Sequence, residues 1–131
     1  MPPAADLSDL QLATIRVLWD RGEATTAEVH KALHRSRGLA VTTVATLLRR
    51  LEERGLVAHR ADGRAFVYRA LLSETEARRS AMSTLLRSLF RNDAQALFSQ
   101  LVAHDAVDDA DLAEMRKLLA DSTRARRGKT R

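Results

Sequence analysis

The chain has 131 residues, of which 45% are hydrophobic, 4% aromatic and 30% charged, and its formal net charge at pH 7 is +5. This length accommodates one small domain with an appendage, or two small units. The absence of cysteine excludes disulfides, thiolate metal sites and cysteine nucleophiles. No apolar run approaches the roughly 20 residues that span a bilayer, and the first residues do not resemble a signal peptide, so we expect a cytoplasmic protein with no membrane insertion.

The charges are distributed unevenly along the chain. Residues 1–72 carry 11 basic and 8 acidic side chains, residues 73–121 carry 6 and 9, and residues 122–131 carry 5 and none. Between Arg35 and Arg69 there are eight arginines and three acidic residues. A local positive excess of this kind favours a polyanionic partner.

The first predicted helix begins after Ser8. Ser8 and Gln11 have the spacing of a capping box, and Leu7 and Leu12 have the spacing of a hydrophobic staple. Gly22 is suited to the position that follows the helix. The apolar side chains expected in the core are Leu12, Ile15, Leu18 and Trp19.

A second capping box, formed by Thr25 and Glu28, predicts a short helix over residues 26–35. Residues 36–38 should end it, since they include Gly38. The side chains expected to be buried are Val29, Ala32 and Leu33.

Residues 41–54 predict a third, amphipathic helix that ends at Gly55, with Val44, Leu47, Leu48 and Leu51 on its buried side. Small hydroxyl side chains on its first turn would let the helix approach phosphates and base edges, and the arginines that follow would reach further phosphates or a guanine. The helix, helix, turn, helix order is that of a helix-turn-helix. The alternative is an ordinary solvated face. The exposed side chains are Thr42, Thr46, Arg49 and Glu53, flanked by Thr43 and Arg50.

A hairpin is predicted directly after the third helix. Residues 56–60 and 65–69 are two short runs of strand-favouring composition, and Asp62-Gly63 between them favours a type I′ turn. Strand alternation brings Phe66 and Tyr68 to one face, which should pack on the helices. Two arginines lie close to the tip, so the hairpin would form the basic wing of a winged helix: Arg60 and Arg64.

Two motifs carry a resemblance to a known family. Thr-Thr-Val-x-Thr-Leu-Leu-x-Arg-Leu-x-x-x-Gly-Leu-Val occupies residues 42–57, and Arg-x-Asp-Gly-Arg-x-Phe-x-Tyr occupies residues 60–68. They resemble the penicillinase repressor family, the BlaI/MecI type of bacterial transcriptional regulators, and a less specific similarity covers about residues 7–121. The resemblance implies operator contacts by Thr43, Thr46 and neighbouring polar side chains, with the hairpin as the wing. Arg54 stands where a lysine is common in the family.

Three further amphipathic helices are predicted after residue 73. Ser73 and Glu76 form another capping box, Asn92-Asp93 separates the first two helices, and Asp108 is suited to cap the last. Helices this short cannot bury their apolar stripes well alone. A second copy of the chain would cover them, and the resemblance likewise implies an intertwined dimer. The alternative is a helical cap folded back on the same chain. The expected dimerisation residues are Met82, Leu85, Leu86, Leu89, Phe90, Leu97, Phe98, Leu101, Leu112, Met115 and Leu119.

The expected organisation is therefore mainly α with one small β-hairpin. Residues 1–72 form a winged-helix DNA-binding domain, and residues 73–121 form a helical dimerisation region. Residues 122–131 are polar and basic without an apolar period, so we expect a disordered tail that adds solubility or weak DNA affinity.

Enzymatic and metal chemistry find no support in the sequence. His30 and His34 are spaced i, i+4, but Lys31 stands where a zincin motif has glutamate, and no third ligand is evident, so we interpret both as solvated. The acidic residues at 105–111 lack the spacing of an EF-hand. The cysteine pairs of copper-responsive relatives are absent. We expect no enzyme, no cofactor and no metal.

The sequence thus predicts a homodimeric repressor that binds a dyad-symmetric operator. The resemblance also implies induction through a membrane sensor protease pathway that leads to cleavage in the dimerisation region, near Gln100 and Leu101. The alternative function is a winged-helix interaction module whose arginine-rich face binds an acidic protein instead of DNA. The expected DNA contacts are Thr42, Thr43, Thr46, Arg49, Arg50, Arg60 and Arg64.

Overall fold

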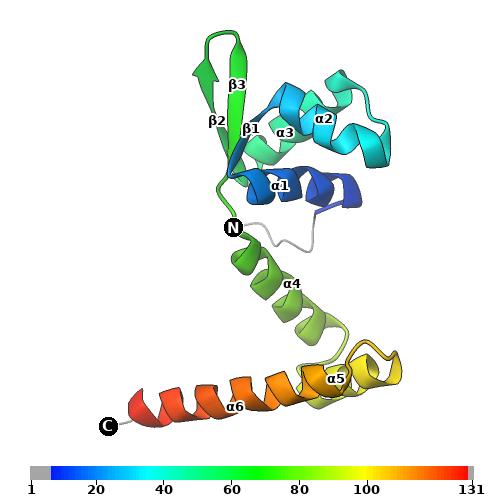
Figure 1. The fold of residues 1–131 in the computed structure, drawn as a ribbon, viewed down its shortest axis with the longest axis vertical. Coiled ribbons are helices and arrows are strands. Elements are labelled where there is room, and N and C mark those ends of the chain that lie inside the picture. The colour runs from blue at the N-terminus through cyan, green and yellow to red at the C-terminus, as the bar shows by residue number, and fades with distance from the viewer. Residues whose placement is uncertain (1–6, 130–131) are drawn as a thin grey trace. The chain divides into compact units, whose positions relative to one another are not determined.

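The computed structural model describes residues 7–129, which form six α-helices and three β-strands (Figure 1). The elements are α1 (Asp9–Arg21), β1 (Glu23–Thr25), α2 (Thr26–Arg37), α3 (Val41–Glu53), β2 (Val57–Asp62), β3 (Ala65–Ala70), α4 (Glu74–Ser88), α5 (Ala94–Ala103) and α6 (Asp109–Lys129). This order confirms a winged helix followed by a helical region. None of the described helices combines the length and apolarity needed to cross a membrane.

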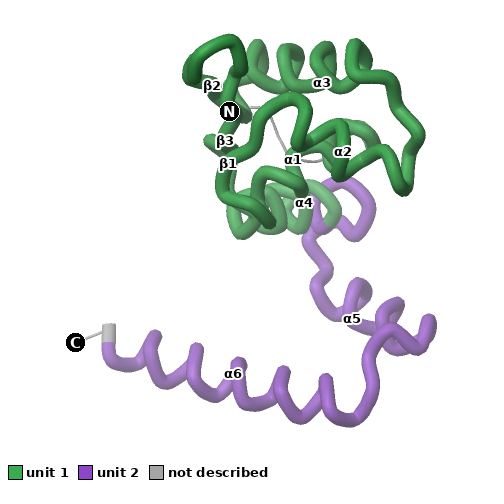
Figure 2. Tube along the Cα trace, turned by 45° about the horizontal axis from the view of Figure 1, so that its top comes forward, with its two compact units in different colours: residues 1–85 green, residues 86–131 purple. Residues whose placement is uncertain are grey.

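The chain divides into two compact units, Met1–Leu85 and Leu86–Arg131 (Figure 2). The expected boundary was residue 72, thirteen residues earlier in the chain. The first unit extends into α4 because Ala77, in the first turn of that helix, is buried in the same core as α1 and α3. Helix α4 therefore begins in the first unit and ends in the second.

The capping boxes predicted for the first two helices are confirmed. Ser8 N–H donates to Gln11 Oε1 at 3.0 Å, and Gln11 N–H donates to Ser8 Oγ at 3.1 Å. Thr25 and Glu28 repeat the arrangement at 2.9 and 3.1 Å. Helix α2 runs two residues further than expected, because Gly38, in the left-handed conformation at φ 61°, ends it.

Strand β1 was not predicted, and it adds a third strand to the hairpin. The sheet is antiparallel in the order β1-β3-β2, with Ala24 opposite Tyr68 and His59 opposite Tyr68 on the other side. The strand has three residues, the last of which, Thr25, is also the α2 N-cap, and three residues are too few to produce a recognisable period. The wing, residues 57–70, therefore has β3 as its central strand and β2 as its edge.

The turn of the wing differs from the predicted one. Asp62 is still paired with Ala65, so the two-residue loop is Gly63-Arg64 rather than Asp62-Gly63. Gly63 has φ 62° and Arg64 does not have a positive φ. This pattern belongs to a type II′ turn, which needs glycine only at its first central position. The shift changes the strand register, extends β2 to Asp62 and puts Arg64 in the turn itself.

The core of the first unit contains most of the expected apolar side chains, with five departures. Ala32 is exposed, and Leu12 is only partly buried. Leu47 is half-buried at the side of α3. Trp19 packs against the core but is only partly buried, and its indole Nε1–H donates to the Leu72 carbonyl oxygen at 2.8 Å. Phe66 is 49% exposed although Tyr68, on the same strand face, is 5% exposed, because the wing extends beyond the helices that cover Tyr68.

The second unit begins within α4 and contains α5 and α6. Asp93 caps α5, and Asp108 accepts a hydrogen bond from the Asp111 amide at 2.8 Å, as its predicted capping role requires. The expectation of a disordered tail is wrong for residues 122–129, because α6 continues to Lys129. A missing apolar period means that no face is buried. It does not prevent a helix here, because five of these eight residues are alanine, arginine or lysine, which have high helix propensity. The last two residues of the expected tail lie outside the described residues.

Candidate nucleic-acid interface

Helix α3 presents a polar face opposite the core residues Val44, Leu48 and Leu51. Thr42 and Thr43 are exposed on its first turn, and Thr46 is half-buried one turn later. The Thr46 hydroxyl donates to the Thr42 carbonyl oxygen at 3.0 Å. Its oxygen can still accept a hydrogen bond, and its methyl group can still touch a thymine methyl.

The N-terminus of α3 lacks a side-chain cap among the described residues. Its N-cap is Ala40, whose methyl group cannot accept a hydrogen bond from the first-turn amides. Those amides and the helix dipole make the helix start electropositive. The first turn of α3 is thus both polar in its side chains and rich in backbone donors.

Helix α1 borders one flank of this face. Leu10 lines the same shallow surface depression as Thr43, Leu47 and Arg50. Arg54 donates from Nη1 to Gln11 Oε1 at 3.3 Å, which ties the end of α3 to the start of α1. The Arg54 guanidinium therefore has a structural partner at the position where the family often has lysine.

The wing tip borders the other flank. Arg64 and Phe66 line a depression together with Val41, the first residue of α3, and with the start of α2. This neighbourhood unites the two parts of the chain that the sequence assigned to DNA contact. Arg64 has no ion pair within residues 7–129.

The remaining candidate arginines differ in how far their charge is compensated. Arg50 is exposed and has no ion pair in the described part of the chain, and Arg49 has only a long contact with Glu53, 3.9 Å from Nε to the carboxylate. Arg60 donates to Glu23 Oε1 at 3.0 Å across the sheet. Among the candidate arginines, Arg60 therefore has the closest ion pair.

A contact between Glu52 and His59 was missed by the sequence analysis. The Glu52 carboxylate accepts from the His59 backbone N–H at 3.1 Å and lies 2.7 Å from His59 Nδ1. The partners are seven residues apart on a helix and a strand, so helix periodicity does not reveal the pair. The only available signal was the combination of an acidic last turn with a polar strand directly after it.

Tyr68 lies beneath this contact. Burial raises the pKa of its hydroxyl, the Glu52 charge adds to the rise, and Arg49 opposes it. The phenol is therefore neutral at physiological pH and belongs to the structural support of the interface.

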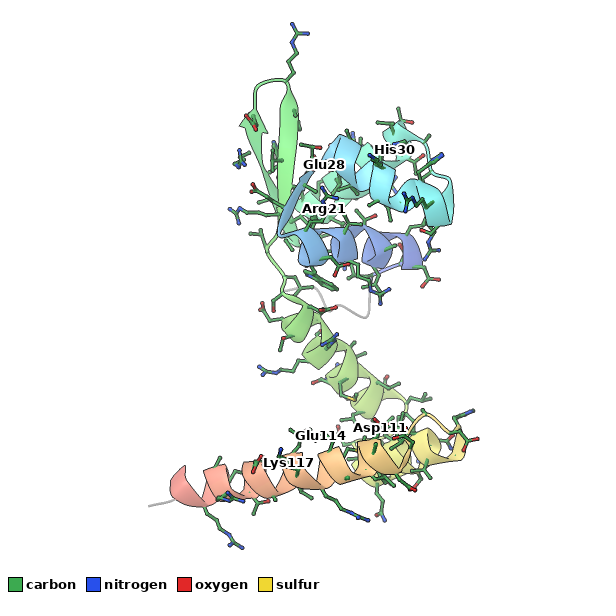
Figure 3. The ribbon with its side chains drawn as sticks, in the orientation of Figure 1. Arg21, Glu28, His30, Asp111, Glu114 and Lys117 are labelled. Atoms are coloured by element: carbon green, nitrogen blue, oxygen red, sulfur yellow. The ribbon has the colours of Figure 1, made fainter. Side chains whose placement is uncertain are left out.

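Of the two histidines of α2, His34 is exposed as expected, whereas His30 is half-buried. Their rings lie 5.5 Å apart between centroids, and His30 Nε2 is 2.9 Å from the Leu39 carbonyl oxygen, in the segment that leads into α3. Arg21 of α1 and Glu28 of α2 point toward each other nearby and form an ion pair of 2.7 Å (Figure 3). The first contact joins α2 to the segment before α3, and the second joins α2 to α1.

The fold and the cationic, hydroxyl-bearing surface formed by α3 and the wing define a winged helix-turn-helix DNA-binding protein. The chain belongs to the penicillinase repressor family, whose family model matches residues 7–121. It is 35% identical to the transcriptional regulator BlaI of Mycobacterium tuberculosis over 117 residues, which cover 88% of this chain and 83% of that protein. It is 23% identical to the penicillinase repressor of Bacillus licheniformis over 121 residues, 92% of this chain and 94% of the relative.

Solved structures agree with this assignment. The DNA-binding domain of the repressor BlaI is 32% identical and superposes with a TM-score of 0.52, covering 58% of this chain and 93% of that domain. The hsRosR-S4 structure superposes with a TM-score of 0.55 over 93% of this chain and 94% of its own, but at 20% identity it shows only the shared fold.

Proposed function

We propose that this DNA-binding transcriptional repressor occupies a dyad-symmetric operator as a homodimer, with α3 of each protomer in a major groove and each wing on the adjacent backbone. The observation that carries the proposal is the single surface made by the uncapped first turn of α3 and the wing-tip Arg64, which border one depression. Recognition helices contact base edges through side chains near their N-termini, which is where the polar side chains of α3 are concentrated.

The proposed contacts divide into two kinds. Base edges are read by hydroxyl and methyl groups of the first turns of α3, and phosphates are bound by guanidinium groups. The uncompensated charges of Arg50 and Arg64 contribute most, and the ion-paired Arg60 contributes least. The base-reading side chains are Thr42, Thr43 and Thr46, and the phosphate-binding ones are Arg49, Arg50, Arg60 and Arg64.

The exposed apolar side chains support a dimer. Of the eleven large hydrophobic side chains that are exposed in the described part of the chain, seven lie in α4, α5 and α6, and an eighth, Leu89, directly follows α4. Leu89 is 70% exposed and Leu119 is 63% exposed. Such a concentration of apolar surface is unusual for a monomer and typical of an interface. A second copy of the chain covers it and presents two recognition helices about one turn of DNA apart, roughly 34 Å or a multiple of it.

Relief of repression by proteolysis is the less direct part of the proposal. Gln100 and Leu101 lie within α5, with Gln100 exposed and Leu101 half-buried. A protease that binds an extended chain needs this helix to open locally. Cleavage there separates the two half-site readers and weakens bivalent binding. The sensor protease pathway and the cytoplasmic location are part of the same proposal.

A gel-shift titration on the DNA upstream of the protein's own gene tests the proposal, with sedimentation to measure the oligomeric state. We expect a dimer whose affinity falls steeply with salt, by about 0.9 in log K per log [salt] for each neutralised phosphate. A monomer that binds this DNA equally well contradicts the dimer. A chain that does not bind duplex DNA but binds an acidic protein supports the interaction-module alternative.

A further inference from the structure

The last turn of α3 is joined to the middle of β2 by the contact between Glu52 and His59. The carboxylate accepts two hydrogen bonds, one from the His59 backbone N–H at 3.1 Å and one from the ring, where Nδ1 lies 2.7 and 2.8 Å from the two carboxylate oxygens. Because a carboxylate can only accept, His59 Nδ1 carries the proton in this contact. We call this arrangement the Glu52–His59 clamp.

The ring of His59 also packs on both aromatic side chains of β3. Its centroid lies 4.3 Å from that of Phe66 and 5.4 Å from that of Tyr68. Tyr68 is buried against the helices, whereas Phe66 is half exposed further toward the tip. The imidazole therefore connects three parts of the molecule: the end of α3, the anchored base of the wing, and its free outer half.

The clamp lies where the wing needs support. β2 is the edge strand of the sheet, and the Glu52 carboxylate satisfies a backbone N–H of that edge that β3 does not. Beyond Arg60, which lies opposite Val67, the ribbon continues to the Gly63-Arg64 turn as two strands only, since β1 pairs with β3 no further than Val67. An isolated two-stranded ribbon is marginally stable and easily changes its angle.

We propose that Glu52 and His59 are positioning residues that hold the wing at a defined angle to α3, so that Arg64 and the recognition helix engage the DNA together. Neither residue is proposed to touch DNA. The inference rests on the proposed wing contact of Arg64. Its physical basis is preorganisation, because a wing that is already oriented loses less conformational freedom on binding.

A double-mutant cycle between the clamp and Arg64 tests this inference on the full chain. Arg64→Ala in the unaltered protein should weaken operator binding by about tenfold, the scale of one charged hydrogen bond, and reduce the salt slope by about 1. In the Glu52→Ala background, the same change should weaken binding by less than about threefold and leave the slope nearly unchanged, because a freely moving wing no longer places Arg64 on its phosphate.

Glu53→Ala is the matched control. It removes the same charge from the same turn of α3, but Glu53 has only a 3.9 Å contact with Arg49. The Arg64→Ala effect should persist in this background. His59→Phe is a second clamp variant that keeps a ring against Phe66 and Tyr68 and the backbone N–H donor, but it removes the ring N–H that donates to Glu52. It should reduce the Arg64→Ala effect in the same direction as Glu52→Ala. Equal Arg64→Ala effects in the unaltered and both clamp backgrounds overturn the inference.

A second measurement tests the orientation of the wing independently of the proposed contact between Arg64 and DNA. The chain has no cysteine, so nitroxide labels can be attached at Ala45→Cys on α3 and Asp62→Cys at the end of β2. Diluting labelled chains with an excess of unlabelled chains limits distances to one protomer. The distance distribution should be narrow in the unaltered chain and in Glu53→Ala, and broad in Glu52→Ala.

The two experiments fail in different ways. If Arg64→Ala has no effect in the unaltered chain, the proposed wing contact is wrong, and the label distances alone decide whether the clamp orients the wing. If the distances stay narrow in Glu52→Ala, the clamp does not orient the wing, whatever Arg64 does. Melting temperatures of all variants should agree closely, since the core of α3 is untouched.

Discussion

The indole Nε1–H of Trp19 donates to the carbonyl oxygen of Leu72 at 2.8 Å, joining residues 53 positions apart. This hydrogen bond fastens the segment that leads into α4 to the end of α1. Leu72 itself is 3% exposed and Ala77, one turn into α4, is 6% exposed. The winged helix is therefore completed by the start of α4, which decides where the chain can be shortened.

A fragment of residues 1–85 should fold cooperatively, because it retains the Trp19–Leu72 hydrogen bond and the burial of Ala77. It should be monomeric, because it lacks most of the exposed apolar side chains of the proposed dimer interface. Its operator affinity should fall by roughly 10² to 10⁴, the avidity that joining two half-site readers provides. A fragment of residues 1–72 should be less stable than the longer one, because it exposes the core that Ala77 covers. Sedimentation, denaturant unfolding and gel shifts measure these properties. A dimeric 1–85 fragment would contradict the assignment of dimerisation to the later helices.

Thr46→Ala should act on specificity. We expect a loss of about 1 to 3 kcal/mol on the operator and little change on random DNA, because the side chain is proposed to contact base edges while its removal leaves the α3 core intact. Within residues 7–129 the hydroxyl bonds only to the Thr42 carbonyl of its own helix, so the free energy of unfolding should change little. Competition gel shifts and thermal melts measure the two effects. Thr46→Val keeps the shape of the side chain and shows whether the hydroxyl or the methyl is read.

Arg60→Ala should weaken DNA binding less than Arg64→Ala. Arg60 is engaged with Glu23 at 3.0 Å, whereas Arg64 has no ion pair in the described part of the chain, so only Arg64 has its full charge available to a phosphate. The salt dependence of binding measures the difference: Arg64→Ala should lower the slope by about 1 on every sequence. Arg21→Ala, which removes an equal charge from the α1–α2 ion pair, is the control. Selective loss at one base pair would mean that the wing reads sequence.

The capping box of α2 should make part of the stability depend on pH. The backbone N–H of Thr25 donates to the Glu28 carboxylate, and with the Thr25 hydroxyl and Arg21 it lowers the pKa of that carboxyl. A lowered pKa in the folded chain means that this contribution is fully present above the pKa of the unfolded chain and is lost as the pH falls through the folded value. Glu28→Gln keeps an acceptor for Thr25 but does not titrate.

The free energy of unfolding should therefore fall more steeply with acidification in the unaltered chain than in Glu28→Gln. Denaturant unfolding at several pH values measures the slopes, and NMR titration of the Glu28 carboxyl gives its pKa directly. A Glu28 pKa at or above the ordinary value for glutamate would contradict this reading of the capping box.

Local features of this protein were predictable because their signals lie within three or four residues. The boxes of Ser8, Thr25 and Ser73 begin their helices as expected, and the caps at Asp93 and Asp108 begin the last two. The helical spacing of the apolar residues in α3 identified the face that remains exposed, since side chains one turn apart share a face. The hairpin and the winged-helix class followed from the same local rules.

Tertiary packing decided the features that depend on residues far apart. Whether Phe66 is covered depends on how far the wing extends past the helices, and whether Arg60 is free depends on Glu23, which only the unpredicted strand β1 brings across the sheet. The Glu52–His59 clamp likewise needs a helix end and a strand edge to meet. Neither partner has a periodic signal, because a contact between two elements depends on the distance and angle at which they pack.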